Sequence, residues 1–116
     1  MRYLLLLHGD AAAEAAMSDA DRRAMVDEHI AFSGTMRAAG VMVAGEGLAS
    51  PDTARTVRFA ADGTSTLTDG PFLEAKEAIG GFYLIEAASA DDAARWASQV
   101  PPSPGLVVEI LTCATG

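Results

Sequence analysis

The sequence reads Arg2-Tyr3-Leu4-Leu5-Leu6-Leu7-His8 near its start, with large apolar side chains at consecutive positions. A strand sends successive side chains to opposite faces, so this stretch supplies apolar groups to both faces of a sheet. A sheet with one face in water alternates apolar with polar residues instead. The stretch therefore predicts a strand that is covered on both faces.

Two later stretches, Gly81–Ala87 and Leu106–Cys113, repeat this two-sided pattern. The chain has two long helical segments, which can cover only one face of the resulting sheet. The other face would be a large apolar patch, which soluble monomers avoid. A second copy packed face to face would cover it, so we predict a homodimer joined through the helix-free sheet face. The alternative is that an inserted hairpin and the segment 69–80 cover that face.

The helices are delimited by their caps. The first should begin at Ser18, a hydroxyl followed by acids, and run to Ala39, with Gly40 as its stop. The second should begin at Ser89 and end before Pro101.

Further strands are expected at 41–46 and at 55–60 and 64–68, the last two flanking the hairpin signal Asp62-Gly63. Without this inserted hairpin the order of elements is βαββαβ, the ferredoxin-like arrangement. Both helices then pack on the same face of one antiparallel sheet. The predicted fold class is therefore α+β, and in the predicted homodimer it would form a dimeric α+β barrel.

Composition limits the classes of function. The 116 residues suffice for one domain, expected to span residues 1–116. A formal charge of −8 argues against binding to nucleic acid. The apolar run Tyr3–Leu7 is far shorter than the roughly 20 residues of a membrane helix, so no membrane contact is expected. Cys113 is the only cysteine, which favours a reducing compartment, and we expect a cytoplasmic protein.

The segment from Thr68 to Gly81, which contains Asp69-Gly70-Pro71-Phe72, resembles the signature of the YCII-related family in its DGPF-motif branch. The resemblance extends along the chain in consistent order, from His8-Gly9-Asp10 through Gly45-Glu46-Gly47-Leu48 to Val108-Glu109-Ile110. It implies a dimeric α+β barrel. The wider superfamily includes small isomerases, decarboxylases and monooxygenase-like proteins that work in a pocket between helices and sheet. Members of the DGPF branch are mostly of unknown activity, and many are encoded beside extracytoplasmic-function sigma factors.

The DGPF segment has two interpretations. Gly70 allows backbone angles closed to other residues, and Pro71 restricts the turn further. In the structural interpretation Asp69 caps the backbone of that turn. In the functional interpretation the rigid turn holds Asp69 at a pocket mouth as a general acid or base.

His29 lies within the apolar stripe of the first helix, which also contains Met25, Phe32 and Met36. Its side chain should therefore face the sheet, where an apolar surround lowers the pKa of an imidazole and leaves a neutral base. We predict a cavity that His29 shares with the carboxylate of Asp69 or Glu46. The alternative is a core histidine whose hydrogen bonds are satisfied internally.

The other candidates are weaker. Glu46 stands between two glycines, which allow close approach of a ligand but also mark bulges and turns. His8 is a candidate ligand-binding residue or a polar strand end. Arg58 and Lys76 are candidates for balancing an acidic ligand, or are solubilising residues. No short histidine spacing supports a metal site, and no cofactor fingerprint is found, so neither is expected.

Two classes of function remain open. The first is an enzyme that performs acid/base catalysis on a small carboxylate- or carbonyl-bearing metabolite, with His29, Asp69 and Glu46 as the catalytic residues. The second is a non-catalytic dimeric module that binds a ligand or regulates a partner, in line with the sigma-factor neighbours that the resemblance implies.

Overall fold

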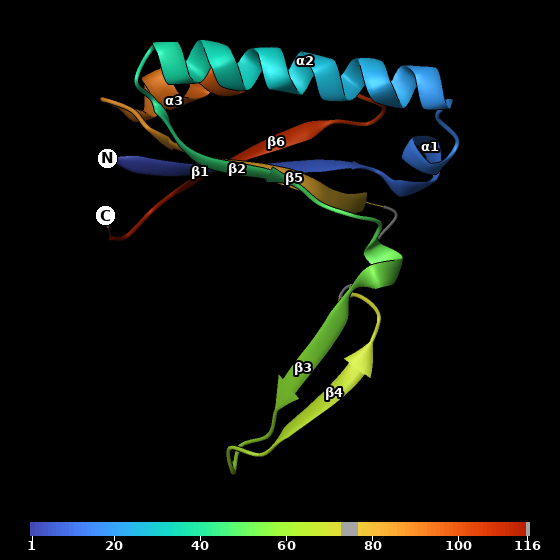
Figure 1. Ribbon diagram of the computed structural model, residues 1–116. Coiled ribbons are helices and arrows are strands. Elements are labelled where there is room, and N and C mark those ends of the chain that lie inside the picture. The colour runs from blue at the N-terminus through green and yellow to red at the C-terminus, as the bar shows by residue number, and fades with distance from the viewer. Residues whose placement is uncertain (73–76, 116) are drawn as a thin grey trace.

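The computed structural model describes residues 1–72 and 77–115. Four strands form an antiparallel sheet in the order β2-β5-β1-β6. They are β1 (Arg2–Asp10), β2 (Met42–Gly47), β5 (Glu77–Glu86) and β6 (Val107–Thr112). Helices α2 (Asp19–Ala38) and α3 (Ala90–Ala97) lie on the same side of the sheet (Figure 1). The predicted α+β, ferredoxin-like fold is confirmed.

The helix ends follow the predicted caps. The Ser18 side chain accepts a hydrogen bond from the Asp21 amide at 3.0 Å, and Ser89 caps α3 in the same way. Gly40 follows α2 with a φ of 75°, the left-handed conformation that glycine adopts without strain. The sequence did not predict the short helix α1 (Ala11–Ala15), which begins where the Asp10 side chain accepts from the Ala13 amide.

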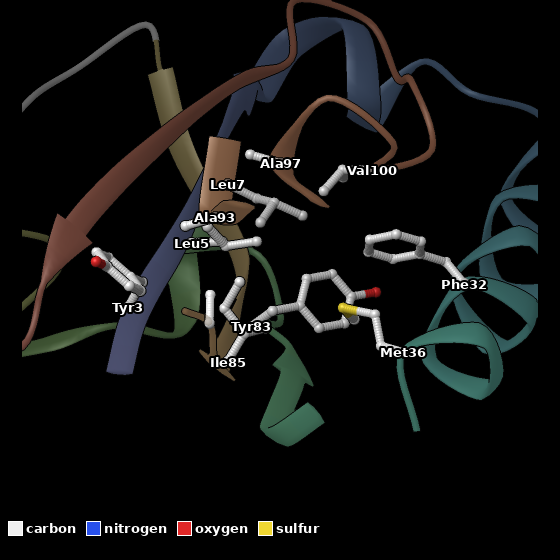
Figure 2. Close-up of a cluster of buried hydrophobic side chains, with 11 residues drawn as sticks. Tyr3, Leu5, Leu7, Phe32, Met36, Tyr83, Ile85, Ala93, Ala97 and Val100 are labelled. Atoms are coloured by element: carbon white, nitrogen blue, oxygen red, sulfur yellow. The ribbon is translucent and has the colours of Figure 1, made fainter. Parts of the chain in front are cut away.

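The core lies between the sheet and the two helices. Along β1 the side chains alternate between buried and half-buried, and Tyr3, Leu5 and Leu7 are the buried set. Figure 2 shows these residues and Tyr83 of β5 on the side that faces α2, where Phe32 and Met36 pack. The two faces of β1 therefore differ as the parity of the sequence predicts. Leu4 and Leu6 point to the face that carries no helix.

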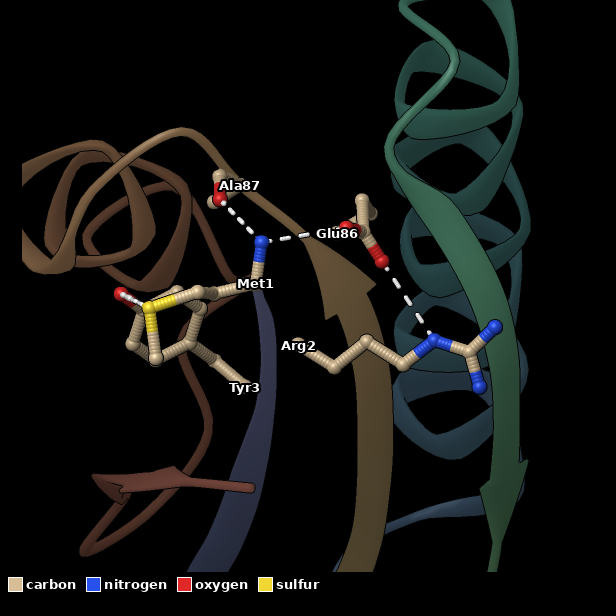
Figure 3. Close-up of polar contacts among 5 residues, drawn as sticks. All are labelled: Met1, Arg2, Tyr3, Glu86 and Ala87. Atoms are coloured by element: carbon tan, nitrogen blue, oxygen red, sulfur yellow. Dashed lines mark hydrogen bonds and ion pairs between the residues drawn. The ribbon is translucent and has the colours of Figure 1, made fainter. Parts of the chain in front are cut away.

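The first residues of β1 are fixed to the end of β5 (Figure 3). The Met1 amine donates to Glu86 Oε1 at 3.1 Å and to the Ala87 carbonyl at 3.3 Å, while Arg2 Nε donates to Glu86 Oε2 at 3.4 Å. The hydrogen bond from the amine is the main cause that lowers the pKa of the Glu86 carboxyl. These bonds agree with the register of β1 against β5, in which Arg2 stands opposite Glu86.

The inserted hairpin, β3 (Arg55–Phe59) and β4 (Ser65–Asp69), forms a separate two-stranded sheet. It projects to the side of the main sheet opposite α2 and α3, and its residues are almost all exposed (Figure 1). The suggestion that the hairpin covers the helix-free face of its own chain is therefore wrong for the described residues. Hydrogen bonds between its own two ends close the base of the hairpin. The Gly70 amide donates to the Ala54 carbonyl, and the Thr56 hydroxyl donates to the Gly70 carbonyl, which joins the two ends in a ribbon of their own.

Gly70→Ala is expected to lower the free energy of unfolding by about 1 kcal/mol. Gly70 has a φ of 106°, where a side chain strains the backbone, although an added methyl group would meet no atom within 4 Å. The cost is therefore conformational. Chemical denaturation of Gly70→Ala and the wild-type protein measures it. Gly34→Ala, in the middle of α2 with no atom near the added methyl group, is the control and should raise stability instead. Equal stability of Gly70→Ala and wild type would mean that the turn tolerates other residues.

Candidate functional site

A cavity of about 480 Å³ lies between α2 and the strands β2 and β5. The residues of α2 that line it recur every three or four positions and so share one helix face: Arg22, Met25, Val26, His29, Ile30, Ser33 and Arg37. The strands contribute a floor that includes Met42, Gly45 and Tyr83. Val26 and Ile30 remain 49% and 64% exposed, because α2 stands away from the sheet here and leaves the cavity open.

His29 and Tyr83 form the main polar contact of the cavity. His29 Nδ1 lies 2.6 Å from the Tyr83 hydroxyl oxygen, and the two rings stack with centroids 5.9 Å apart. Phe32 packs edge-on against the Tyr83 ring at 5.4 Å, which fixes the phenol from a second side. Tyr83 is 6% exposed, so its hydroxyl is held inside while His29, half-buried, forms part of the cavity wall.

Burial changes the protonation of both groups. It lowers the pKa of the His29 imidazole from its ordinary 6.5, and the nearby Glu28 carboxylate opposes this only in part. Burial also raises the pKa of the Tyr83 phenol above 10.0, against a smaller opposite effect of the Ser33 hydroxyl. At neutral pH both side chains are therefore uncharged. One proton can lie in the hydrogen bond between His29 Nδ1 and the Tyr83 phenol oxygen. The other imidazole nitrogen, Nε2, is then available to exchange a proton with a ligand.

The lowered pKa of His29 makes stability depend on pH. Below pH 6.5 the unfolded chain binds a proton at His29 more readily than the folded chain does, so the unfolding free energy should fall as the pH drops through 6.5 toward the folded pKa. Above pH 6.5 this contribution is constant. Melting temperatures of wild type and His29→Gln between about pH 7.5 and 5.5 test this, since the variant should lose less stability on acidification. His8→Gln keeps His29 and is the control. Parallel curves for wild type and His29→Gln would contradict the assignment.

Two glycines shape the floor of the cavity. A side chain at Gly45 would come within 2.7 Å of the Tyr83 ring, and one at Gly81 within 2.7 Å of the Glu46 carbonyl oxygen. Glycine at these positions therefore lets β2 approach β5 closely and leaves room for the phenol. Glu46 itself pairs with Phe82, the neighbour of Tyr83, so its side chain belongs to the opposite face of the strand. Glu46 and His29 both line the cavity, and a contact of the Glu46 carboxylate with His29 stays a prediction.

The charge of the cavity differs from that of the chain. The chain as a whole carries −8, yet the cavity wall holds Arg22 and Arg37, one on each side of His29 along α2. Arg22 donates from Nη2 to the Glu14 carbonyl at 3.0 Å, which fixes its guanidinium near the start of the helix. Among the described lining residues the only acid is Glu46, which the register assigns to the other strand face. The cavity is therefore suited to an anionic group.

Comparison with known proteins agrees with this architecture. The model of the YCII-related domain matches residues 1–111. The chain belongs to this family. An uncharacterized protein of Rhizobium meliloti (strain 1021) is 34% identical over 108 residues, which cover 90% of this chain and 86% of the relative.

In this YCII-related domain none of the four residues of the DGPF segment, 69–72, lines the cavity. Asp69 is at the end of β4, with its side chain 88% exposed, and its Oδ1 accepts from Arg55 Nε at 3.0 Å. It neither lines the cavity nor meets His29, contrary to the predicted convergence. Arg58 lies on the same hairpin, with its guanidinium 5.0 Å from the centre of the Phe72 ring. Lys76, the remaining candidate, is outside the described residues.

His8 lies on the helix-free face of the YCII-related sheet. Its Nε2 is 3.0 Å from Glu109 Oε1, and its side chain is 23% exposed. It is therefore separated from the cavity by the sheet. Within the described part of the chain, no group of three or more His, Cys, Asp or Glu side chains is placed to hold a metal ion. No helix in residues 1–72 and 77–115 is long and apolar enough to cross a membrane.

The sequence interpretation missed Tyr83, Arg22, Ser33 and Arg37. The signal for the three α2 residues was present, since each falls on the helix face of His29 by its spacing. Tyr83 was read only as one apolar position of a strand. Its parity with Ile85, which is fully buried, places it under α2, and a phenol there requires a polar partner.

Proposed function

We propose that this YCII-related protein binds a small carboxylate-bearing molecule in the cavity of α2, β2 and β5 and transfers a proton on it, with His29 as the base. The observation that carries the proposal is the 2.6 Å contact of His29 Nδ1 with the buried Tyr83 hydroxyl. A general base needs a fixed orientation and a neutral form at the working pH, and this contact supplies the first while burial supplies the second.

The proton transfer uses both nitrogens of the imidazole. With Nδ1–H donating to the Tyr83 oxygen, Nε2 carries the lone pair that takes a proton from a carbon next to a carbonyl group. The imidazolium that forms keeps its Nδ1–H bonded to Tyr83, and the same Nε2 proton can return at another position of the ligand. Arg22 and Arg37 supply the opposite charge for a carboxylate, and Met25, Val26 and Ile30 supply contacts for an apolar body.

The test uses a panel of small 2-oxo acids and unsaturated acids, each paired with its amide. A thermal-shift series should give stabilisation by at least one acid and less by its amide, because a ligand of the native state raises the melting temperature by mass action. Proton NMR in D2O should then show exchange of a carbon-bound hydrogen of that acid in the presence of the protein. Loss of exchange in His29→Gln together with retained folding supports the proposal. No stabilisation by any acid or amide counts against it.

One observation favours a non-catalytic alternative. Within the described residues, no hydrogen bond or ion pair joins the Asp69 or Glu46 carboxylate to His29, whose hydrogen-bond partner is the Tyr83 hydroxyl. A ligand-binding or regulatory module, including one that acts with a sigma factor, predicts stabilisation by an acid with no exchange of its hydrogens. The two experiments above separate these functions.

We also propose that the protein acts as a homodimer through its helix-free sheet face. Apolar side chains on that face are left half-buried or exposed in one chain: Leu4, Leu6, Phe82, Leu84, Val107 and Leu111. Two polar contacts lie on the same face: His8 Nε2 is 3.0 Å from Glu109 Oε1, and Arg2 Nε is 3.4 Å from Glu86 Oε2. A second copy packed on this face would cover these apolar side chains. The single Cys113 suits a reducing compartment, and we propose the cytoplasm.

A further inference from the structure

The hairpin β3–β4 has one apolar face that no other segment in residues 1–72 and 77–115 covers. Val57 stands opposite Leu67 and Phe59 opposite Ser65, so these side chains share a face. Val57 and Leu67 are each 51% exposed and Phe59 is 75% exposed. The other face carries Thr56, Thr66 and Thr68 together with Arg58. The ribbon is therefore amphipathic, although water surrounds it on both faces in the single chain.

A ribbon of this kind needs a surface to lie on. A two-stranded hairpin by itself is at best marginally stable in water, and a third strand or a packed surface normally completes it. Here the ribbon forms a sheet of its own, apart from β2, β5, β1 and β6. It also projects to the helix-free side (Figure 1). Two uncovered apolar surfaces of the chain, the sheet face and the ribbon face, thus lie on the same side of the molecule.

We propose that the hairpin is a dimer arm, whose apolar face of Val57, Phe59 and Leu67 packs on the second copy of this chain. The inference rests on the homodimer proposed above and adds an interface that the sheet face does not include. In a two-fold dimer each arm reaches the partner in the same way, so one symmetric contact covers both arms and both sheet faces. A different protein would have to match the two surfaces separately.

The dimensions of the layers agree with this arrangement. Packed sheets lie about 10 Å apart. The strands of the arm have 5 residues each, which at about 3.3 Å per residue gives an arm of roughly 17 Å. The arm is thus longer than the distance between two packed sheets. An arm that starts at the sheet of one chain can therefore reach past the sheet of the partner chain.

Charge also favours a second copy. The ion pair of Arg55 and Asp69 lies on the same face of the ribbon as Val57 and Leu67. It neutralises the charge at the base of the arm within the hairpin itself. An apolar surface without net charge suits a copy of a chain that carries −8 as a whole. A surface that binds a basic partner would instead carry unpaired acidic side chains.

The test compares two substitutions in the full chain, one on each face of the arm. Leu67→Asp places a charge in the proposed contact, and Thr66→Asp places the same residue on the opposite face of the same strand. Sedimentation equilibrium should give a dimer dissociation constant that rises at least about tenfold for Leu67→Asp and stays close to wild type for Thr66→Asp. Amide hydrogen exchange in residues 55–69 should slow when the wild-type protein is raised above its dissociation constant. Equal dissociation constants for the two variants, or exchange independent of concentration, would overturn the proposal.

The experiments distinguish a wrong arm proposal from a wrong homodimer proposal. If Leu111→Asp on the sheet face dissociates the dimer while Leu67→Asp does not, the sheet interface stands and the arm is wrong. If the wild-type chain sediments as a monomer at every concentration and its hairpin exchange never changes, both proposals are overturned.

Discussion

Leu111→Asp is expected to turn the homodimer into monomers. Leu111 lies on the edge strand β6 opposite Leu4, on the face that carries no helix, and is 40% exposed in a single chain. A carboxylate there meets water in the monomer, so the fold should survive. In the proposed interface it would be buried without a partner, which costs on the order of 3 kcal/mol. The dissociation constant should therefore rise by about a hundredfold or more.

Analytical ultracentrifugation at micromolar concentration measures this change, and circular dichroism checks that the variant is folded. Ala31→Asp, on an exposed position of α2, introduces the same charge away from the sheet and should leave the dimer intact. A folded Leu111→Asp dimer with the wild-type dissociation constant would place the interface elsewhere. So would a stable wild-type monomer, and the two-sided apolar strands would then need another explanation.

Much of the fold could be predicted because helix caps, turn residues and the apolar pattern of the strands all indicate the same elements. The serine caps at Ser18 and Ser89 and the positive-φ glycines Gly40 and Gly63 stand where local rules place them. The parity of β1 separated the buried from the half-buried leucines. Local rules did not show the direction of the hairpin. An Asp62-Gly63 turn forms the same two-stranded ribbon whether that ribbon packs on the main sheet or projects from it.

The candidate site was predicted only in part, for a physical reason. Helical spacing fixed the direction of His29, because residues on one helix share a known geometry. Its partner is 54 residues away and on another element, so only the tertiary structure identifies Tyr83. Asp69 was linked to His29 by its motif alone. In the separate ribbon the Asp69 carboxylate pairs with Arg55 and is 88% exposed, and it does not line the cavity.

His29→Leu is expected to abolish proton exchange on the bound acid and to destabilise the fold. Loss of a positioned general base typically lowers the rate by about a hundred- to ten-thousandfold. The stability effect follows from Tyr83, whose hydroxyl is 2.6 Å from His29 Nδ1 and 6% exposed. Without His29 this buried hydroxyl loses that partner, which costs about 1–3 kcal/mol. A fall in stability therefore does not by itself mark His29 as structural.

A double-mutant cycle separates the two roles. Tyr83→Phe removes only the hydroxyl, and in the variant with both His29→Leu and Tyr83→Phe no buried polar group is left unpaired, so much of the lost stability should return. Proton exchange should stay absent in the double variant, because the base is still missing. Tyr83→Phe alone should keep measurable exchange at a reduced rate, since Nε2 remains but its orientation is less fixed. Exchange at the wild-type rate in a folded His29→Leu variant would show that the base is another residue. Additive losses of stability around the cycle would show that the contact between Nδ1 and the phenol does not couple the two side chains.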